Sequence, residues 1–134
     1  MTSTSPPLAP RVLVILGDQW PRALLRASLI DAGYDAVGAR TIPEALSLLT
    51  GEGERGPVRL LIIDRRALGD QMDGLSELLG RCDHPPVVLV AAAGETAPSG
   101  AWSQVIRRPV TIGEIVAAVQ ARLPLASTDS GSTD

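Results

Sequence analysis

The chain has 134 residues, enough for one domain with a single sizeable core and too few for two ordinary domains. Its 12 basic and 15 acidic residues give a net charge of -3, which repels a phosphate backbone, so we expect no nucleic-acid partner. The single cysteine, Cys82, excludes an internal disulfide and a cysteine-rich metal site, as expected for a reducing compartment.

The composition of the two ends of the chain and the length of its apolar segments indicate where in the cell the protein is expected. Residues 1–10 are rich in Ser, Thr and Pro and lack the positive region and the apolar core of a signal peptide. No apolar run approaches membrane-spanning length, so we expect no membrane partner. Residues 125–134 are mostly small and polar. We predict a cytoplasmic protein with one domain over residues 11–124, a disordered N-terminal tail over 1–10, and a disordered C-terminal tail or linker over 125–134.

The first half of the domain predicts two strands and two helices. Apolar residues occupy 12–16 and, more weakly, 34–39, and both segments are predicted strands. Between them, residues 21–32 have helical periodicity, with a proline in the first turn and a glycine just past the end. Residues 41–44 have the spacing of a capping box, so a second helix is expected to begin there and to stop at Gly51.

The middle of the domain contains the strongest apolar run of the chain. This run is a predicted strand over 59–63, and it is followed directly by Asp64. A lone carboxylate at the carboxyl end of a buried strand is where α/β folds place their chemistry. A loop with two Asp/Gly pairs follows, and then a short helix whose apolar face is Leu75, Leu78 and Leu79. A further strand is predicted over 87–90.

The last third departs from the alternation of strands and helices. Residues 91–101 hold two glycines and a proline without apolar periodicity, so we predict a loop where a helix is due. A short strand over 104–107 follows. Residues 111–114 have a second capping-box spacing and open a helix with an apolar stripe that Pro124 ends. Strands that alternate with helices in this way are typical of βαβ units and a parallel sheet.

Several stretches of the sequence resemble the receiver domain of bacterial two-component response regulators. They are residues 11–34, the eight residues from Pro57 to Asp64, and Met72-Asp73-Gly74-Leu75. The basic residue before Pro109 fits the same pattern, and the resemblance covers roughly 11–123. It implies a CheY-like, flavodoxin-like α/β fold: a doubly wound, five-stranded parallel sheet in the order 2-1-3-4-5, here with the fourth helix replaced or shortened to a loop.

The resemblance also implies a set of site positions. In the family, an acceptor aspartate takes a phosphoryl group from a partner kinase, with Mg²⁺ held by an acidic pair at the end of the first strand. A hydroxyl residue and a lysine contact the phosphoryl group. Asp64 falls on the acceptor position. The other positions fall on Leu16 and Gly17 for the acidic pair, Asp18 for a frequent third acid, Ala91 for the hydroxyl residue and Arg108 for the lysine.

Three of these positions have lost the chemistry that the family uses. Leu16 and Gly17 offer no side-chain oxygen to a cation, and Ala91 has no hydroxyl. Phosphoryl transfer depends on positioning and on cations at the oxygens, so these losses remove most of what the protein contributes. Asp18 with Asp64 would still be a minimal Mg²⁺ site. Alternatively, Asp64 pairs with an arginine, either Arg108 or Arg65, and a bridge to Arg108 would hold one conformation.

These departures favour a pseudo-receiver, an atypical receiver domain of two-component or phosphorelay signalling that acts by binding another protein. We expect it to be no enzyme and to need no cofactor. The alternative is a phosphoacceptor response regulator phosphorylated at Asp64 with Mg²⁺. A third class, a flavodoxin-like enzyme or nucleotide binder, needs a phosphate-cradling loop after the first strand, and residues 16–20 are too bulky and acidic for one.

The predicted loop also suggests where a partner binds. Without the fourth helix, the face made by strand 4, strand 5 and the last helix would be left uncovered, and uncovered apolar surface tends to mark a partner site. We therefore predict that residues 92–100 are mobile and that a protein partner or a second copy of the chain covers this face. Trp20 and Trp102 are candidate surface anchors, with ordinary packing as the favoured interpretation.

We interpret two weaker motifs as structural rather than as functional sites. Residues 51–56 match G-x-G-x-x-G, but they follow a helix and precede a strand, the reverse of a dinucleotide site. Cys82 and His84, the only histidine, lie close in sequence without a second cluster of ligands, so we predict no metal site and no nucleophile there.

Overall fold

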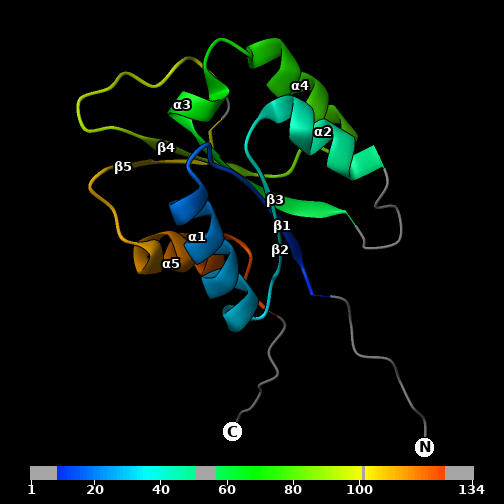
Figure 1. Ribbon diagram of the computed structural model, residues 1–134, viewed down its shortest axis with the longest axis vertical. Helices are drawn as coiled ribbons and strands as arrows, with labels where there is room; N and C mark the ends of the chain where they lie inside the picture. Colours follow the sequence, from blue (N-terminus) through cyan, green and yellow to red (C-terminus); the bar gives the residue numbers. More distant parts are fainter. Residues whose placement is uncertain (1–8, 51–56, 101, 126–134) are drawn as a thin grey trace, which may run out of the picture.

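A computed structural model of the chain describes residues 9–50, 57–100 and 102–125. Figure 1 shows a twisted central sheet with helices on both faces. The sheet has five strands in the order β2-β1-β3-β4-β5, and every neighbouring pair is parallel. The predicted fold class, a doubly wound flavodoxin-like sheet, is confirmed.

The strands and the main helices follow the predicted order along the chain, with the one-turn helix α3 added after β3. The strands are β1 (Arg11–Ile15), β2 (Asp35–Ala39), β3 (Val58–Asp64), β4 (Val87–Ala91) and β5 (Gln104–Arg107). The helices are α1 (Gln19–Ala32), α2 (Ile42–Thr50), α3 (Arg65–Leu68), α4 (Met72–Arg81) and α5 (Ile112–Arg122). None of the described helices is long and apolar enough to cross a membrane.

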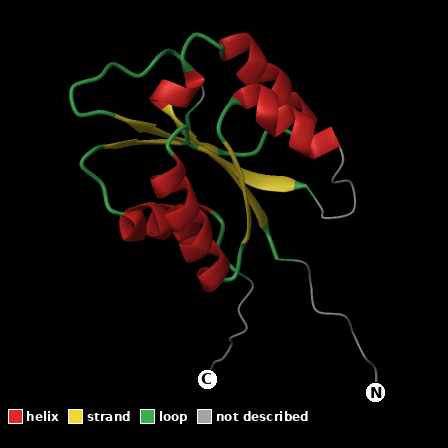
Figure 2. Ribbon diagram, viewed as in Figure 1, coloured by secondary structure: helices red, strands yellow, loops and turns green. Residues whose placement is uncertain are grey.

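Two apolar layers, one on each face of the sheet, form the core. Successive strand residues point to opposite faces, so Leu13 and Ile15 of β1 pack toward α2 and α4, whereas Val12 and Val14 pack toward α1 and α5. Figure 2 shows these two groups of helices on either side of the strands. Because β1, β3 and β4 are buried on both faces, their sequences are continuous apolar runs.

Local signals place the helix ends. Gly33 ends α1 in the left-handed conformation with φ 109°, where a side chain would be strained. Thr111 opens α5 with both bonds of the predicted capping box. At α2 only half of the predicted box forms: the Glu44 N–H donates to Thr41 Oγ1, but the Glu44 carboxylate accepts from the N–H of Arg40.

The structure corrects three predicted boundaries. Helix α1 begins at Gln19 rather than at Pro21, because a proline within the first turn lacks only an N–H that has no intrahelical partner. The one-turn helix α3 occupies part of the predicted loop, and Asp64 caps it. Helix α4 begins at Met72, so the expected turn at residues 73–74 is helical.

The loop between β4 and β5 has no helix in the described residues 92–100, as predicted, but it does not leave the strands bare. Ala97 and Trp102 pack on the core, and the Trp102 indole donates to the carbonyl of Pro98 at 2.7 Å. Strand β4 is buried throughout, and β5 is half-buried except at Arg107. The expected uncovered apolar surface over β4 and β5 is therefore wrong, because this loop takes the place of the helix.

Burial raises the pKa values of Tyr34 and Cys82, and these two shifts predict how the free energy of unfolding changes with pH in the alkaline range. Tyr34 donates its hydroxyl to the carbonyl of Leu123 at 2.6 Å, and burial raises its pKa. Burial also raises the pKa of the Cys82 thiol, an effect that the charge of Arg11 opposes. The sequence has no lysine, one tyrosine and one cysteine, so these are the side chains that titrate near pH 9 to 11.

We therefore predict that the free energy of unfolding falls as the pH rises past about 9 to 10. Both groups are held neutral by the fold, so their contribution is present below the pKa of the unfolded chain and is lost as the pH passes the folded pKa. Urea unfolding at several pH values measures this, with Tyr34→Phe/Cys82→Ala as the variant that should lose most of the dependence. An unchanged alkaline slope in that variant would contradict the assignment.

Candidate functional site

The candidate site lies at the carboxyl edge of the sheet, where β1 and β3 end side by side. Asp64 is the last residue of β3, and its side chain is only 6% exposed. The register pairs Ile15 with Ile63, so the loop that follows β1 begins next to Asp64. A buried carboxylate requires partners, because an isolated charge in a low-dielectric interior is costly.

Both oxygens of Asp64 are occupied by groups of the chain itself. The guanidinium of Arg108 donates from Nη2 to Oδ2 at 2.8 Å, and the backbone N–H of Arg66 donates to Oδ1 at 2.9 Å. Arg108 is held in place at the end of β5 by its own N–H, which donates to the carbonyl of Ala91 at 2.8 Å. Of the two arginines expected as partners, Arg108 is the one that the structure places on Asp64.

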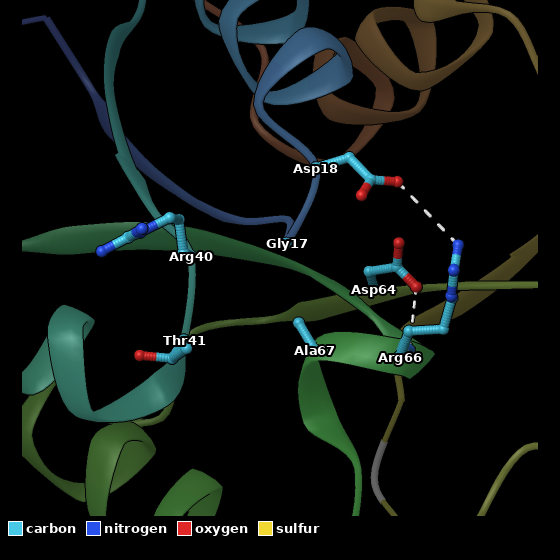
Figure 3. A pocket seen from close by; sticks show the side chains of 7 residues that line it. All are labelled: Gly17, Asp18, Arg40, Thr41, Asp64, Arg66 and Ala67. Carbon is cyan, nitrogen blue, oxygen red and sulfur yellow. Dashed lines mark hydrogen bonds and ion pairs between the residues drawn. The ribbon is translucent and has the colours of Figure 1, made fainter.

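Asp18 is close to the site but has another partner. Its carboxylate Oδ2 lies 3.9 Å from Nη1 of Arg66, and its side chain is 68% exposed. Figure 3 shows the Asp18 and Asp64 carboxylates on the same side of the hollow, with the Arg66 side chain extending between Asp18 and the start of α3. Asp18 precedes α1 without capping it. Of the two carboxylates that a minimal magnesium site would use, Asp64 is thus hydrogen-bonded to Arg108 and to the N–H of Arg66, whereas Asp18 lies only at ion-pair distance from Arg66.

An open hollow of about 350 Å³ adjoins these carboxylates. It is lined by Gly17, Asp18, Arg40, Thr41, Asp64, Arg66 and Ala67. In Figure 3 the side chains of Arg40 and Thr41 point away from Asp64. Glu44 accounts for that orientation, since it pairs with Arg40 at 3.7 Å and donates its N–H to Thr41 Oγ1. The hollow is therefore lined by as many cations as carboxylates.

The residues present do not fit the magnesium site that the fold family implies. Leu16 is buried and apolar, Gly17 has no side chain, and Ala91, at the position expected for a hydroxyl residue, is fully buried. Over the part of the chain that the structure describes, no three residues among His, Cys, Asp and Glu are grouped to hold a metal ion. Mg²⁺ requires oxygen ligands in near-octahedral geometry, and here arginine donors take the oxygens of Asp64.

The remaining candidate residues lie elsewhere. Arg65 turns away from Asp64 and donates to the carbonyl of Gly69 at 3.0 Å, so it is not the partner of Asp64. Cys82 is buried, and His84 follows it in a turn with positive φ on the opposite edge of the sheet. The glycine motif at 51–56 lies outside the described residues.

The role of Arg66 was not anticipated from the sequence. Its N–H donates to the Asp64 carboxylate, which caps α3, and its guanidinium faces Asp18. A usable signal was present: an aspartate that ends a strand commonly accepts from the N–H two residues later, which starts a turn or helix there. Trp20 was expected to pack, and it is instead 72% exposed.

Comparison with solved structures shows that the chain has the fold of response regulator receiver domains. It is 14% identical to a response regulator from Thermotoga maritima, with a TM-score of 0.64 over 85% of this chain and 97% of that chain. A receiver domain protein from Clostridium thermocellum gives 20% identity and a TM-score of 0.67, over 84% and 93% of the two chains. HP1043, an orphan response regulator of H. pylori, gives 16% and 0.66, over 88% and 99%.

Sequence comparisons do not add to this likeness. No family model matches the sequence, and a search of curated proteins finds no match.

The ion pair on Asp64 gives a first prediction for the site. Asp64→Asn removes the charge that compensates the partly buried Arg108, and we expect the free energy of unfolding to fall by about 1–3 kcal/mol. Urea unfolding measures the change. Asp70→Asn, at an exposed loop position, is the matched control and should cost little. Equal stability of Asp64→Asn and the control would show that the pair contributes nothing.

The loss of the acidic pair gives a second prediction. A Cβ atom at Gly17 would meet nothing within 4 Å, so an aspartate can begin there without a clash, next to Asp18 in the chain. We expect Mg²⁺ at millimolar concentration to raise the melting temperature of Gly17→Asp/Arg108→Lys, since a ligand that binds only the folded state stabilises it. Gly17→Asn/Arg108→Lys is the control. An equal rise in the unmodified chain would contradict the assignment.

Proposed function

We propose that this chain is a pseudo-receiver: a receiver-fold domain that takes part in two-component or phosphorelay signalling by binding another protein. The observation that carries the proposal is the state of Asp64, whose two oxygens accept from Arg108 and from the N–H of Arg66. In this arrangement an internal guanidinium neutralises the acceptor position, so the domain needs no cofactor. Nucleophilic use of Asp64 would require that pair to break.

The proposed mechanism is signalling by a fixed shape. Arg108 lies at the end of β5 and Asp64 at the end of β3, so their bond holds the two strand ends together across β4. A guanidinium is planar and stays charged at all physiological pH values. Its bond to Asp64 is therefore available at all times, whereas a phosphoryl group is present only after a kinase has acted. The surface that a partner recognises would then be present constitutively. We also propose a cytoplasmic location and no enzymatic activity.

The second candidate is a phosphoacceptor receiver phosphorylated at Asp64. The open hollow of about 350 Å³ beside Asp64 favours it, because it gives space for a phosphoryl group and contains Asp18 as a further carboxylate. Arg66, on the rim, could neutralise that group. This candidate requires Arg108 to move from Asp64 to the phosphoryl oxygens, and it lacks the hydroxyl of the family at Ala91.

Incubation with acetyl phosphate and Mg²⁺, and separately with beryllofluoride and Mg²⁺, separates the two candidates. We expect the intact mass to show no added phosphoryl group and the melting temperature not to rise, because the oxygens of Asp64 are taken. A conventional receiver treated in parallel verifies the reagents. Addition of one phosphoryl group to the chain, lost in Asp64→Asn, would establish the second candidate instead.

A further inference from the structure

A second, smaller hollow lies beside Arg108, on the face of the sheet that α1 and α5 cover. Its volume is about 230 Å³. Figure 1 shows α1 and α5 next to each other on that face. The hollow is bounded by the ends of β1 and β4 and by the first turns of the two helices, and most of its lining is apolar. We call it the apolar hollow, and its apolar walls include Leu16, Val90, Val110, Ile112 and Ile115.

The walls of the apolar hollow are continuous with the core. Leu16, Val90 and Ile115 are buried, and Val110 and Ile112 pack against the same apolar layer. Packing therefore holds these side chains in place, and a ligand would meet a surface that is already formed. Leu16, which offers no oxygen to a cation, is thus part of a wall suited to an apolar group.

The charged residues at the apolar hollow favour an anion. Arg66 and Arg108 line it with one acid, Asp18, so two positive charges stand against one negative charge. Asp64 lines the larger hollow and not this one. The Arg108 guanidinium donates one N–H to Asp64 and makes no other hydrogen bond within the described part of the chain. The Arg66 guanidinium lies 3.9 Å from Asp18, beyond hydrogen-bond distance. Both arginines therefore have N–H donors left for a ligand.

We propose that the apolar hollow binds a small monocarboxylate that carries an apolar tail. Its carboxylate accepts from the remaining N–H donors of Arg108 and from Arg66, in the planar geometry that a guanidinium and a carboxylate share. Its tail lies against the apolar walls. The volume limits the ligand to about eight non-hydrogen atoms, at the roughly 30 Å³ that a water molecule takes up in the liquid. One excess positive charge matches a monoanion rather than a phosphate dianion.

This inference goes beyond the proposed function, because it assigns a small-molecule ligand to the domain. The ligand would share Arg108 with Asp64, so it would lie next to the pair that joins the ends of β3 and β5. The experiments that test it contain no phosphoryl donor and no Mg²⁺. Their outcome is therefore separate from that of the acetyl phosphate experiment.

Titration of the full chain with hexanoate, followed by ¹H–¹⁵N NMR at constant ionic strength, tests the proposal. We expect millimolar hexanoate to shift the amide signals of Leu16, Val110 and Ile112. Butyrate, two methylenes shorter, should bind about tenfold more weakly, because each buried methylene contributes a factor of up to about four. Hexanamide has the same tail without the charge and should bind severalfold more weakly. No shift at these residues, or binding of butyrate or hexanamide equal to that of hexanoate, would overturn the proposal.

Two arginine variants test where the carboxylate binds. Arg66→Gln removes one cation from the apolar hollow and should weaken hexanoate binding about two- to fivefold, the range for an exposed ion pair. Arg40→Gln is the matched control, because Arg40 is similarly exposed and lines the larger hollow but not the apolar one. The melting temperature without ligand verifies that both variants are folded. Unchanged binding in Arg66→Gln, or equal weakening in both variants, would contradict the placement.

Discussion

The ion pair between Asp64 and Arg108 joins the end of β3 to the end of β5 across the end of β4. It depends on the parallel sheet, because parallel strands bring the carboxyl ends of β3 and β5, and with them two residues 44 positions apart, to the same edge. A buried carboxylate is costly without a partner, and here the guanidinium of Arg108 supplies one.

The rest of the site is consistent with the proposed pairing of Asp64 with an internal cation. Leu16 and Ala91 are buried at positions where the receiver family uses an acid and a hydroxyl, so polar groups there would now be unsatisfied unless a cation or phosphoryl group were bound. The guanidinium of Arg66 lies 3.9 Å from Asp18, and the N–H of Arg66 donates to the second oxygen of Asp64. The sheet thus has the receiver architecture, while an arginine of the chain itself pairs with the carboxylate at its edge.

The loop after β4 shows how a missing element can be compensated locally. Residues 92–100 have no helical pattern, yet Trp102 and Ala97 pack on the core where a helix would pack. The apolar surface that the sequence led us to expect over β4 and β5 is therefore covered. Instead, α1 carries exposed apolar side chains. The sequence pattern does not reveal them, because the exposed Leu24 and Ile30 are as apolar as the buried Leu25 and Leu29.

The sequence by itself determined the order of strands and helices, the parallel sheet and the position of Asp64, because continuous apolar runs, capping boxes and terminal glycines are local signals. It also determined which oxygen ligands are lacking, since residue identity is enough to exclude Leu16, Gly17 and Ala91. It left open whether Arg108 or Arg65 pairs with Asp64 and which surface is exposed. Only the tertiary structure decided those points, because they depend on distances between residues far apart in the chain and on what covers each helix.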